Sequence, residues 1–258
     1  MPSKHPIAPI PPLRHPPNLY AGTSGWAYPS WKPGFYPAQL PQKKFLDFYA
    51  SQLTSVEVNY TFRTLPTAKM LAGWLAATGP NFRFSFKAPQ RITHFKRLAD
   101  CDALVEQLLT ALELVIARRQ LGVLLFQLPP NFKANPTLLA SFLQLSAFAG
   151  PAPRLAFEFR HNSWFTEDTY SILREHNAAL CVAEGDDLIT PEVHTASHRC
   201  LRLRRTGGYT PAEIQAFAAR LTPLSKHDDL FVYFRHEDEP TGALNAAAFL
   251  QAATRVLT

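Results

Sequence analysis

The chain has 258 residues, of which 47% are hydrophobic and 18% are charged, and it carries a formal net charge of +6. This length accommodates one large α/β domain or two smaller ones, and the composition is typical of a globular protein in water. No apolar run approaches the ~18 residues of a membrane span, so we expect no contact with a membrane. The modest positive charge favours an anionic ligand as a partner, without establishing nucleic-acid binding.

Residues 1–17 are dense in proline and lack the apolar segment of a secretory signal. Because proline removes a backbone donor and fixes φ, we expect a disordered tail there. The three cysteines, Cys101, Cys181 and Cys200, are widely spaced and form no Cys-x-x-Cys motif. This spacing argues against a disulfide framework and a thiolate metal site, so we expect a cytoplasmic protein in which Cys181 and Cys200 are buried thiols.

Strand-like and helix-like segments alternate from residue 18 onwards. The expected strands, in chain order, span residues 18–23, 55–59, 82–87, 122–128, 154–160, 178–183, 200–203 and 230–234. The expected helices span residues 43–52, 67–77, 102–119, 136–147, 167–177, 211–221 and 243–256, and the connection after the sixth strand is irregular. Eight such units in one domain, residues 18–258, predict an α/β fold, a single (β/α)8 TIM-type barrel with parallel strands.

Three of these strands alternate large apolar residues with polar ones, and residues i and i+2 of a strand share a face. Glu57 therefore lies with Asn59, Ser85 with Lys87, and Glu158 with Arg160. An open doubly wound sheet, the alternative fold, normally has strands that are apolar on both faces, so this alternation favours the barrel. If helices cover the apolar face, the charged face lines a polar lumen.

In such barrels, functional side chains come from the C-terminal ends of the strands and the loops that follow. Glu57 and Glu158 are the candidate catalytic acid and base, with Lys87 and His94 beside them. The candidate ligand-binding residues at the strand ends are Asn59, Gln127, Arg160, His161, Asp186, Arg202, Arg204 and Arg235. Both signs of charge occur here, so structural ion pairs are an alternative explanation for part of the set.

The two glutamates suit glycoside hydrolysis, in which one carboxyl group is protonated and the other ionised. Lys87 and Arg160 would instead hold both ionised, which favours a salt-bridged network. A divalent metal is a further alternative, because His94, His161, Glu158 and Asp186 are suitable ligand types. These residues show no local spacing such as His-Glu-x-x-His, so we assign no metal ligand.

The segment from Arg202 to Glu213 predicts a helix start at Thr210, with Pro211 at N1 and Glu213 completing a capping box. Glycines at 207 and 208 precede this helix, and three arginines lie just upstream. An anion site is one interpretation of this pattern, since barrels often bind phosphate after the seventh strand. The other is that the glycine pair only turns the chain.

Aromatic residues gather in the first loop, with Trp26, Tyr28 and Trp31, and again at Trp164 after the fifth strand. Tryptophan is unusual in a solvent-exposed loop unless it packs or stacks. We interpret these residues either as a platform for a base or a sugar ring, or as packing of the loop onto the barrel rim.

Several ordered motifs resemble the DUF72 (YecE-like) family over roughly residues 19–250. They are GWAYPSW at 25–31 with FYP at 35–37, VEVN at 56–59 with TFR at 61–63, FKAP at 86–89 with ITH at 92–94, LFQLPP at 125–130, and EFRHNSW at 158–164. The resemblance implies a TIM barrel with a pocket at the strand ends. It implies no reaction, because the family has no assigned activity.

The C-terminal third departs from the family pattern. The family usually carries an aspartate just after the sixth strand, Arg-Leu-His-Gly at the seventh and Tyr-Phe-Asn-Asn near the eighth; this chain has EGD at 184–186, RLRR at 202–205 and YFRH at 233–236. Asn245 is kept, and we include it among the ligand-binding candidates. Because a histidine and asparagines are exchanged for arginines and a histidine, the departures shift the pocket toward anion binding.

The leading hypothesis is a protein that binds, and hydrolyses or isomerises, a small anionic or phosphorylated compound. Lys87, Arg160, Arg202 and Arg235 would hold the anion, and Glu57 or Glu158 would act as acid or base. A non-catalytic module for nucleotides or nucleic acid, using the aromatic loop and basic rim, is the second hypothesis. A divalent-metal-dependent hydrolase is the third. The sequence leaves the cofactor open.

Overall fold

A computed structural model describes residues 16–149, 153–186, 189–235 and 238–256 of the chain. Residues 1–15 of the expected tail lie outside these ranges. In the described part, eight parallel strands form one sheet in the order β1-β8-β7-β6-β5-β4-β3-β2. They are β1 Leu19–Thr23, β2 Ser55–Val58, β3 Arg83–Lys87, β4 Leu121–Gln127, β5 Arg154–Glu158, β6 Ala179–Glu184, β7 His198–Leu203 and β8 Asp229–Phe234. The predicted (β/α)8 barrel is confirmed.

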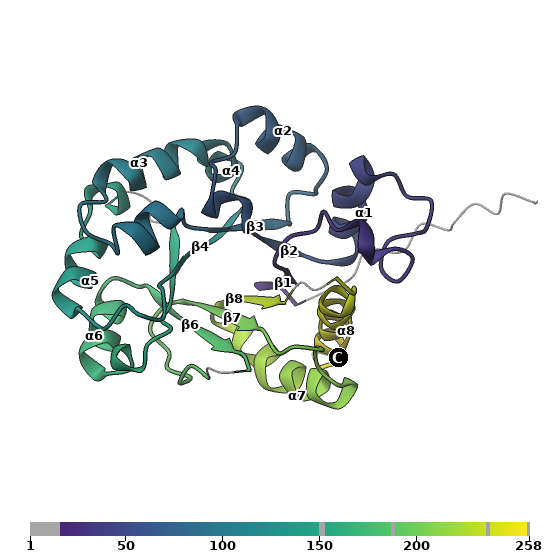
Figure 1. The fold of residues 1–258 in the computed structure, drawn as a ribbon. Coiled ribbons are helices and arrows are strands. Elements are labelled where there is room, and N and C mark those ends of the chain that lie inside the picture. The colour runs from purple at the N-terminus through teal and green to yellow at the C-terminus, as the bar shows by residue number, and fades with distance from the viewer. Residues whose placement is uncertain (1–15, 150–152, 187–188, 236–237, 257–258) are drawn as a thin grey trace, which may run out of the picture.

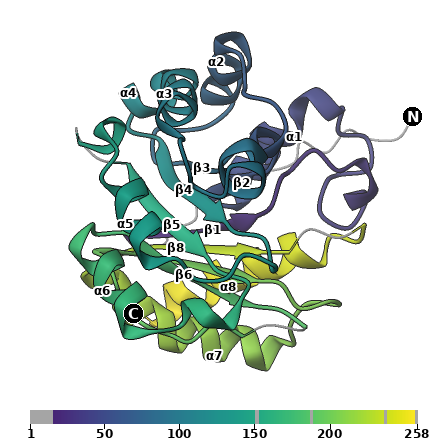
Figure 2. The ribbon, with the colours of Figure 1, turned by 60° about the vertical axis from the view of Figure 1, so that its left-hand side comes forward.

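The helices lie outside the sheet and surround it (Figures 1 and 2). They are α1 Phe45–Gln52, α2 Ala68–Ala76, α3 Asp102–Ala111, α4 Glu113–Ala117, α5 Pro136–Leu143, α6 Glu167–Glu175, α7 Pro211–Leu221 and α8 Thr241–Val256. The single helix expected over residues 102–119 is wrong, because the chain bends at Leu112, where φ is −100° and ψ is 3°. Neither glycine nor proline marks this bend in the sequence.

The barrel closes between β1 and β2 at a seam that a tyrosine from α1 bridges. The Tyr49 hydroxyl accepts a hydrogen bond from the Thr23 amide at 2.8 Å and donates one to the Ser55 carbonyl at 3.0 Å. A Cβ on Gly22 would lie 1.8 Å from the Ser55 carbonyl oxygen, so only glycine permits this close approach. A bridge between Ser24 and Glu57 extends the seam to the strand ends. The seam therefore fixes the position of Glu57 in the upper lumen.

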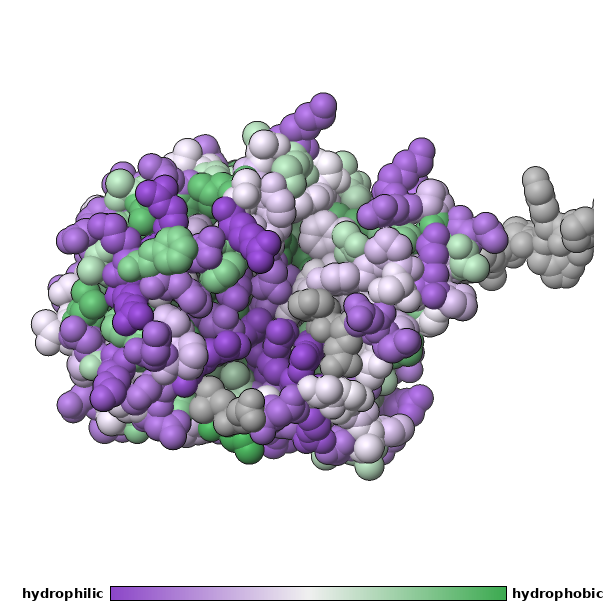
Figure 3. Space-filling view, viewed as in Figure 1, coloured by the Kyte–Doolittle hydropathy of each residue, from purple (hydrophilic) through white to green (hydrophobic). Residues whose placement is uncertain are grey.

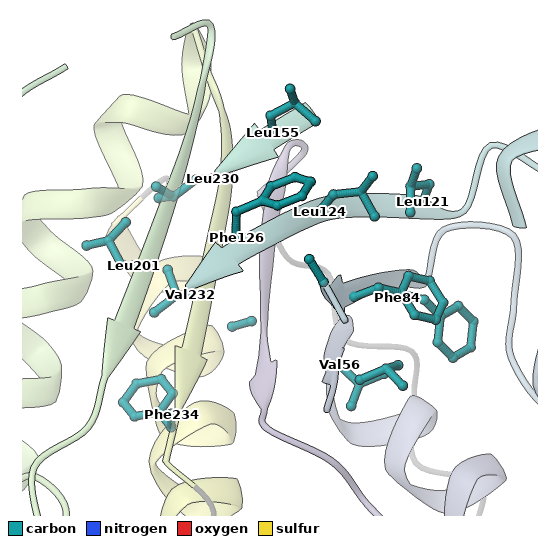
Figure 4. Packing of buried hydrophobic residues seen from close by; sticks show 14 of the residues in the cluster. Val56, Phe84, Leu121, Leu124, Phe126, Leu155, Leu201, Leu230, Val232 and Phe234 are labelled. Atoms are coloured by element: carbon teal, nitrogen blue, oxygen red, sulfur yellow. The ribbon is translucent and has the colours of Figure 1, made fainter. Parts of the chain in front are cut away.

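Alternation along the strands separates an outer apolar layer from the barrel interior. On β4, Leu124 and Phe126 belong to the outer apolar layer (Figure 4), and Phe126 packs on Phe142 of α5 with ring centroids 5.2 Å apart. Val123 and Leu125 belong to the inward cluster. The inward cluster also includes Tyr20, Phe231 and Tyr233, as well as Cys181 and Cys200, whose thiols are hydrogen-bonded at 3.5 Å and form no disulfide. The lower lumen is thus filled with side chains, and only its C-terminal end remains for a polar site.

The connection from β6 to β7 is irregular, as predicted from the sequence. Its described residues contain no helix, and Glu184 forms an antiparallel bridge with Ile189. Strand β5 ends at Glu158, so Arg160 lies in the loop beyond the strand. No helix in the described ranges has the length and apolar character needed to cross a membrane.

Candidate functional site

The floor of the upper lumen is a buried arginine between two buried glutamates. Arg202 on β7 is 1% exposed, while Glu57 on β2 and Glu158 on β5 are 0% and 2% exposed. Arg202 Nε and Nη2 donate to the two carboxylate oxygens of Glu57, each at 2.8 Å, and Nη1 donates to Glu158. One guanidinium therefore joins strands from three sides of the barrel.

Both glutamates are held in the ionised state by this geometry. Burial alone would raise the pKa of Glu158, but the charges of Arg202 and Arg160 outweigh it and lower the pKa to about 2. Burial likewise opposes ionisation of Glu57, and the charge and hydrogen bonds of Arg202 again prevail and lower its pKa. These carboxylates therefore accept hydrogen bonds from Arg202 and orient it. They form a salt-bridged network, which was one of the two alternatives given by the sequence.

Neighbouring polar groups complete the shell of the two carboxylates. Ser24 donates to Glu57 Oε1 at 2.8 Å, and Gln127 Nε2 donates to Glu158 Oε1 at 2.8 Å. Arg160 Nε reaches the same oxygen of Glu158 at 3.0 Å. Because the glutamate oxygens are already occupied, the carboxylates have little capacity left for a ligand.

Two cations above this floor have no carboxylate within ion-pairing distance in the described part of the chain. Arg204, the next inward-facing residue after Arg202, donates only to the Ser24 hydroxyl, at 2.6 Å from Nη1. Lys87 Nζ lies 4.1 Å from the centre of the Phe62 ring and makes no hydrogen bond or ion pair to a described residue. A cation that is removed from water without an anionic partner is costly, so these two side chains stand out.

Burial shifts the pKa of both of these cations downward. It lowers the pKa of Arg204 to about 10, with the positive charge of Arg202 as the second cause. The same two causes lower the pKa of Lys87 to about 8, against an opposing effect of Glu57 and Glu158. Lys87 thus has a substantial neutral fraction near neutral pH, which an exposed lysine does not.

Arg204 and Arg160 line two cavities, and Lys87 lines one of them. One cavity has a volume of about 740 Å³ and the other about 650 Å³. The larger is lined by Glu158, Arg160, His161, Asp186, Arg204 and Arg235, among others. The smaller is lined by Asn59, Phe62, Lys87, Gln127, Arg160, Arg202 and Arg204, among others. Strongly hydrophilic residues gather near the centre of the face shown in Figure 3.

The rim beside β6 carries a second, more exposed ion pair. Asp186 accepts hydrogen bonds from the Thr206 amide at 3.1 Å and from its hydroxyl at 2.6 Å. Arg235 Nη1 lies 3.6 Å from Asp186 and donates to the Thr206 hydroxyl at 2.7 Å. These contacts tie the β7–α7 loop to the rim and occupy the carboxylate of Asp186.

His94 and His161 lie beside the cavities in different settings. His94, in the π-helical turn η4 Arg91–Phe95, packs at a right angle to Phe62 with ring centroids 5.0 Å apart. Burial and the charges of Lys87 and Arg160 lower its pKa. His161 Nδ1 caps the short helix η6 Asn162–Trp164 through the Ser163 amide at 3.1 Å.

The tryptophans pack into the protein, which is the second of the two interpretations given to them. Trp31 and Trp164 are 0% exposed, and Trp164 stacks on Phe159 with centroids 4.5 Å apart. Trp26 packs at a right angle to Trp74 of α2. Tyr28 lies closer to the mouth, where its hydroxyl donates to the Ser24 carbonyl at 2.9 Å. Burial, opposed by the charge of Arg204, raises the pKa of Tyr28 to about 12.

The segment after β7 is a turn followed by the N-terminus of α7, and protein side chains supply hydrogen bonds to its backbone. Thr210 and Glu213 form the predicted capping box, so the Glu213 carboxylate occupies the N-terminus of α7. Gly207 and Gly208 have φ of 77° and 79°, the left-handed region that favours glycine. Asn245 of α8 accepts a hydrogen bond from the Tyr209 amide and donates one to the Tyr209 carbonyl, and so holds this turn. Asn245 is not among the residues that line the two cavities.

The residues that could ligate a metal do not converge. Across the described ranges, no group of three or more histidine, cysteine, aspartate or glutamate side chains is placed to hold a metal ion. Glu57 and Glu158 face Arg202 instead.

Two residues of the site, Phe62 and Arg63, are not among the candidate site residues predicted from the sequence. Phe62 supports Lys87, and Arg63 lines the smaller cavity. The motif TFR at 61–63 was the signal that pointed to them.

Comparison with known proteins places this barrel among relatives of undetermined role. A family model described as "Protein of unknown function DUF72" matches residues 20–257. UPF0759 protein YunF of Bacillus subtilis is 27% identical over 171 residues, which are 65% of this chain and 58% of that protein. UPF0759 protein YecE of Escherichia coli is 33% identical over 114 residues, which are 44% of this chain and 39% of that protein. The chain therefore spans about half the length of these relatives.

Among solved structures, the crystal structure of a DUF72 family protein from Thermotoga maritima aligns with a TM-score of 0.78. The two are 27% identical, and the alignment covers 90% of this chain and 98% of that one.

Proposed function

We propose that this chain, which belongs to the DUF72 family of proteins of unknown function, binds a small anionic compound such as a phosphate ester at the mouth of its barrel. The observation that carries the proposal is Arg204, a partly buried guanidinium whose only described side-chain partner is a serine hydroxyl. An anionic ligand would supply the missing countercharge and so convert an unfavourable burial into a favourable one.

Lys87 and Arg160, which line the smaller cavity together with Arg204, support the same conclusion. Among the described residues, Lys87 has no anionic partner, and the Arg160 guanidinium donates only from Nε, to Glu158, so its terminal nitrogens are left for a ligand. A planar guanidinium binds carboxylate or phosphate in a bidentate manner. Arg160, Arg204 and Lys87 together therefore suit the oxygens of one anionic group.

Chemistry on the bound compound would fall to Lys87 and His94 more than to the glutamates. A carboxylate with a pKa near 2 is a weak base and is not protonated near pH 7, so Glu158 is poorly suited to proton transfer. Glu57 and Glu158 instead position Arg202. Lys87, with a pKa of about 8, can exchange a proton near neutral pH, as isomerisation or hydrolysis requires.

Neither alternative function has comparable support in the described residues. Stacking of bases would need accessible aromatic rings, and Trp31 and Trp164 of the predicted platform are buried in the core, which leaves Tyr60, 47% exposed, as an exposed ring at the smaller cavity. The metal-dependent hydrolase would need converging ligands, and the two best-placed glutamates are committed to Arg202. We therefore favour the small anion.

The proposal is tested by thermal unfolding of the purified protein with inorganic phosphate and a panel of phosphorylated and carboxylated metabolites. A ligand present at about 100 times its Kd adds about 2.7 kcal/mol to the free energy of unfolding. We expect at least one anion to raise the Tm of the wild type. We expect this rise to disappear in Arg204→Gln and to persist in Arg205→Gln, whose guanidinium pairs with Glu184 and Glu213 instead.

A second readout comes from the ligand-free variants. Arg204→Gln removes a partly buried cation without a carboxylate partner, so its stability without ligand should not fall below that of the wild type. An anion that stabilises Arg204→Gln as much as the wild type would contradict the proposal. So would a panel in which no anion shifts the Tm. Binding of single-stranded RNA that weakens steeply with salt would favour the nucleic-acid alternative.

A further inference from the structure

We infer that Lys87 forms an imine with an aldehyde or ketone group of the anionic compound, an inference that rests on the proposed anion site. The ligand class is then a short hydroxylated carbonyl compound that carries a phosphate or carboxylate. Lys87 is the residue that ends β3, and β3 is a rigid strand of the barrel. Its amine is therefore presented to the cavity from a fixed position.

The first requirement of a nucleophilic lysine is an amine that no neighbour restrains. Lys87 Nζ meets it, because it has no hydrogen bond or ion pair with any residue in the described ranges, although Glu57 and Glu158 lie near enough to influence it. Arg202 takes up these two carboxylates, so neither is left to pair with the lysine. A lysine whose task was only structural would be expected to pair with one of them.

The second requirement is a neutral amine at working pH. Burial together with the positive charge of Arg202 lowers the pKa of Lys87 to about 8, although the face of the Phe62 ring, 4.1 Å from Nζ, favours the ammonium form. At pH 7 about 10% of such a lysine is neutral, against about 0.03% of an ordinary lysine. Desolvation beside another cation is a recognised way of activating a lysine for imine formation.

The third requirement is a cavity that positions the carbonyl against the amine. Lys87, Arg160 and Arg204 line the same cavity of about 650 Å³, so an anionic group on the arginines brings the rest of a small molecule toward Nζ. Asn59 lines this cavity too, and its side-chain oxygen is buried without a hydrogen-bond partner among the described residues. It can accept a hydrogen bond from a hydroxyl of the ligand, which is why we include a hydroxyl in the class.

The step needs no oxidant or reductant. The nitrogen lone pair of Lys87 attacks the carbonyl carbon, and the carbonyl oxygen gains a proton to give a carbinolamine. This hydroxyl then takes up a second proton and leaves as water while the C=N bond forms. Both protons come from the amine nitrogen, so that a neutral amine and a carbonyl become an imine and one water. His94, which packs on the same Phe62 ring, is a group that can carry these protons.

The experiment uses pyridoxal 5′-phosphate and pyridoxal, which differ in one phosphate. For each compound the labelling of Lys87 is expressed relative to that of Lys69, because pyridoxal is largely an internal hemiacetal and labels every lysine more slowly. Each is incubated with the full-length protein at pH 7, the imine is reduced with cyanoborohydride, and the labelled lysine is identified by peptide mass spectrometry. We expect pyridoxal 5′-phosphate to label Lys87 about 300-fold faster than an exposed lysine such as Lys69, in line with its neutral fraction. Inorganic phosphate should slow this labelling.

Variants separate this inference from the proposed function. Lys87→Met should lose the rapid labelling and the imine absorbance, while Lys69→Met should keep both. If inorganic phosphate raises the Tm but Lys87 is labelled no faster than Lys69, the imine is refuted and the anion site stands. If Lys87 is labelled rapidly and equally by both aldehydes, with no protection by phosphate, the imine stands and the anion site is refuted. Circular dichroism of Lys87→Met confirms that loss of labelling does not reflect unfolding.

Discussion

Replacing Glu158 with glutamine tests whether the floor of the barrel is held by charge. The Glu158→Gln variant would keep the size of the side chain and could still accept a hydrogen bond from Gln127, but it would leave Arg202 with one carboxylate instead of two. It therefore isolates the contribution of one buried negative charge.

The size of the effect follows from the pKa of Glu158. This pKa is about 2 in the folded protein against an ordinary value of 4.5, and the side chain is almost fully buried. A carboxylate whose pKa is lowered by folding contributes stability that is complete above its unfolded pKa and is lost as pH falls toward its folded pKa. The contribution is roughly 3 kcal/mol at pH 7 and about half of that at pH 3.

Urea denaturation at a series of pH values from 3 to 8 measures this difference directly. We expect Glu158→Gln to be less stable than the wild type at pH 7, with a gap that narrows as the pH falls. Glu106→Gln, on the exposed face of α3, is the control and should match the wild type at every pH. A gap as large at pH 3 as at pH 7 would refute the reasoning, because it would mean that the loss comes from shape and not from charge.

Three further predictions concern the scaffold. Tyr49→Phe leaves two backbone groups at the β1–β2 seam without partners and should cost about 1–3 kcal/mol in urea denaturation. Gly22→Ala should lower the yield of folded protein, because its Cβ would overlap the Ser55 carbonyl, whereas Gly73→Ala, with open space in α2, should stabilise by about 0.5–1 kcal/mol. Burial lowers the pKa of His198 to about 4, so the wild type should lose stability between pH 6.5 and 4, and His198→Gln should show a flatter profile by urea denaturation.

Much of the fold could be predicted because its signals are local. Period-two alternation is a local signal that predicts the strands. The polar face of β2, β3 and β5 predicts a polar lumen even without knowledge of the strand order. The break between α3 and α4 could not be predicted, since Leu112 is a good helix former and both segments are apolar on one face. We attribute the bend at Leu112 to tertiary packing, because no residue near it is a helix breaker.

The candidate site divides in the same way. Lys87, Arg160 and Arg204 were identified as strand-end residues, and they do line shared cavities. The pairing pattern could not be predicted, because Arg202 and Glu57 are 145 residues apart in the sequence and meet only when the barrel closes. The same limit applies to the tryptophans: composition shows that Trp31 must pack or stack, and only the fold shows that it packs.

The balance of charges at the mouth of the barrel indicates the charge of the anion that would bind there. It also indicates how the affinity for that anion would depend on pH. Arg202 faces two ionised carboxylates, so the floor retains one negative charge. Arg160, Arg204 and a protonated Lys87 together exceed that charge by two, which matches a phosphate monoester dianion. When Lys87 loses its proton, near a pH of about 8, the excess falls to one. The affinity for a dianion should therefore decrease as pH rises through this value, and that for a monoanion such as a carboxylate should decrease less. Because Arg202 pairs with both carboxylates, the charge of Lys87 is not neutralised by either of them. The net charge that a ligand meets at the mouth therefore depends on the protonation of Lys87.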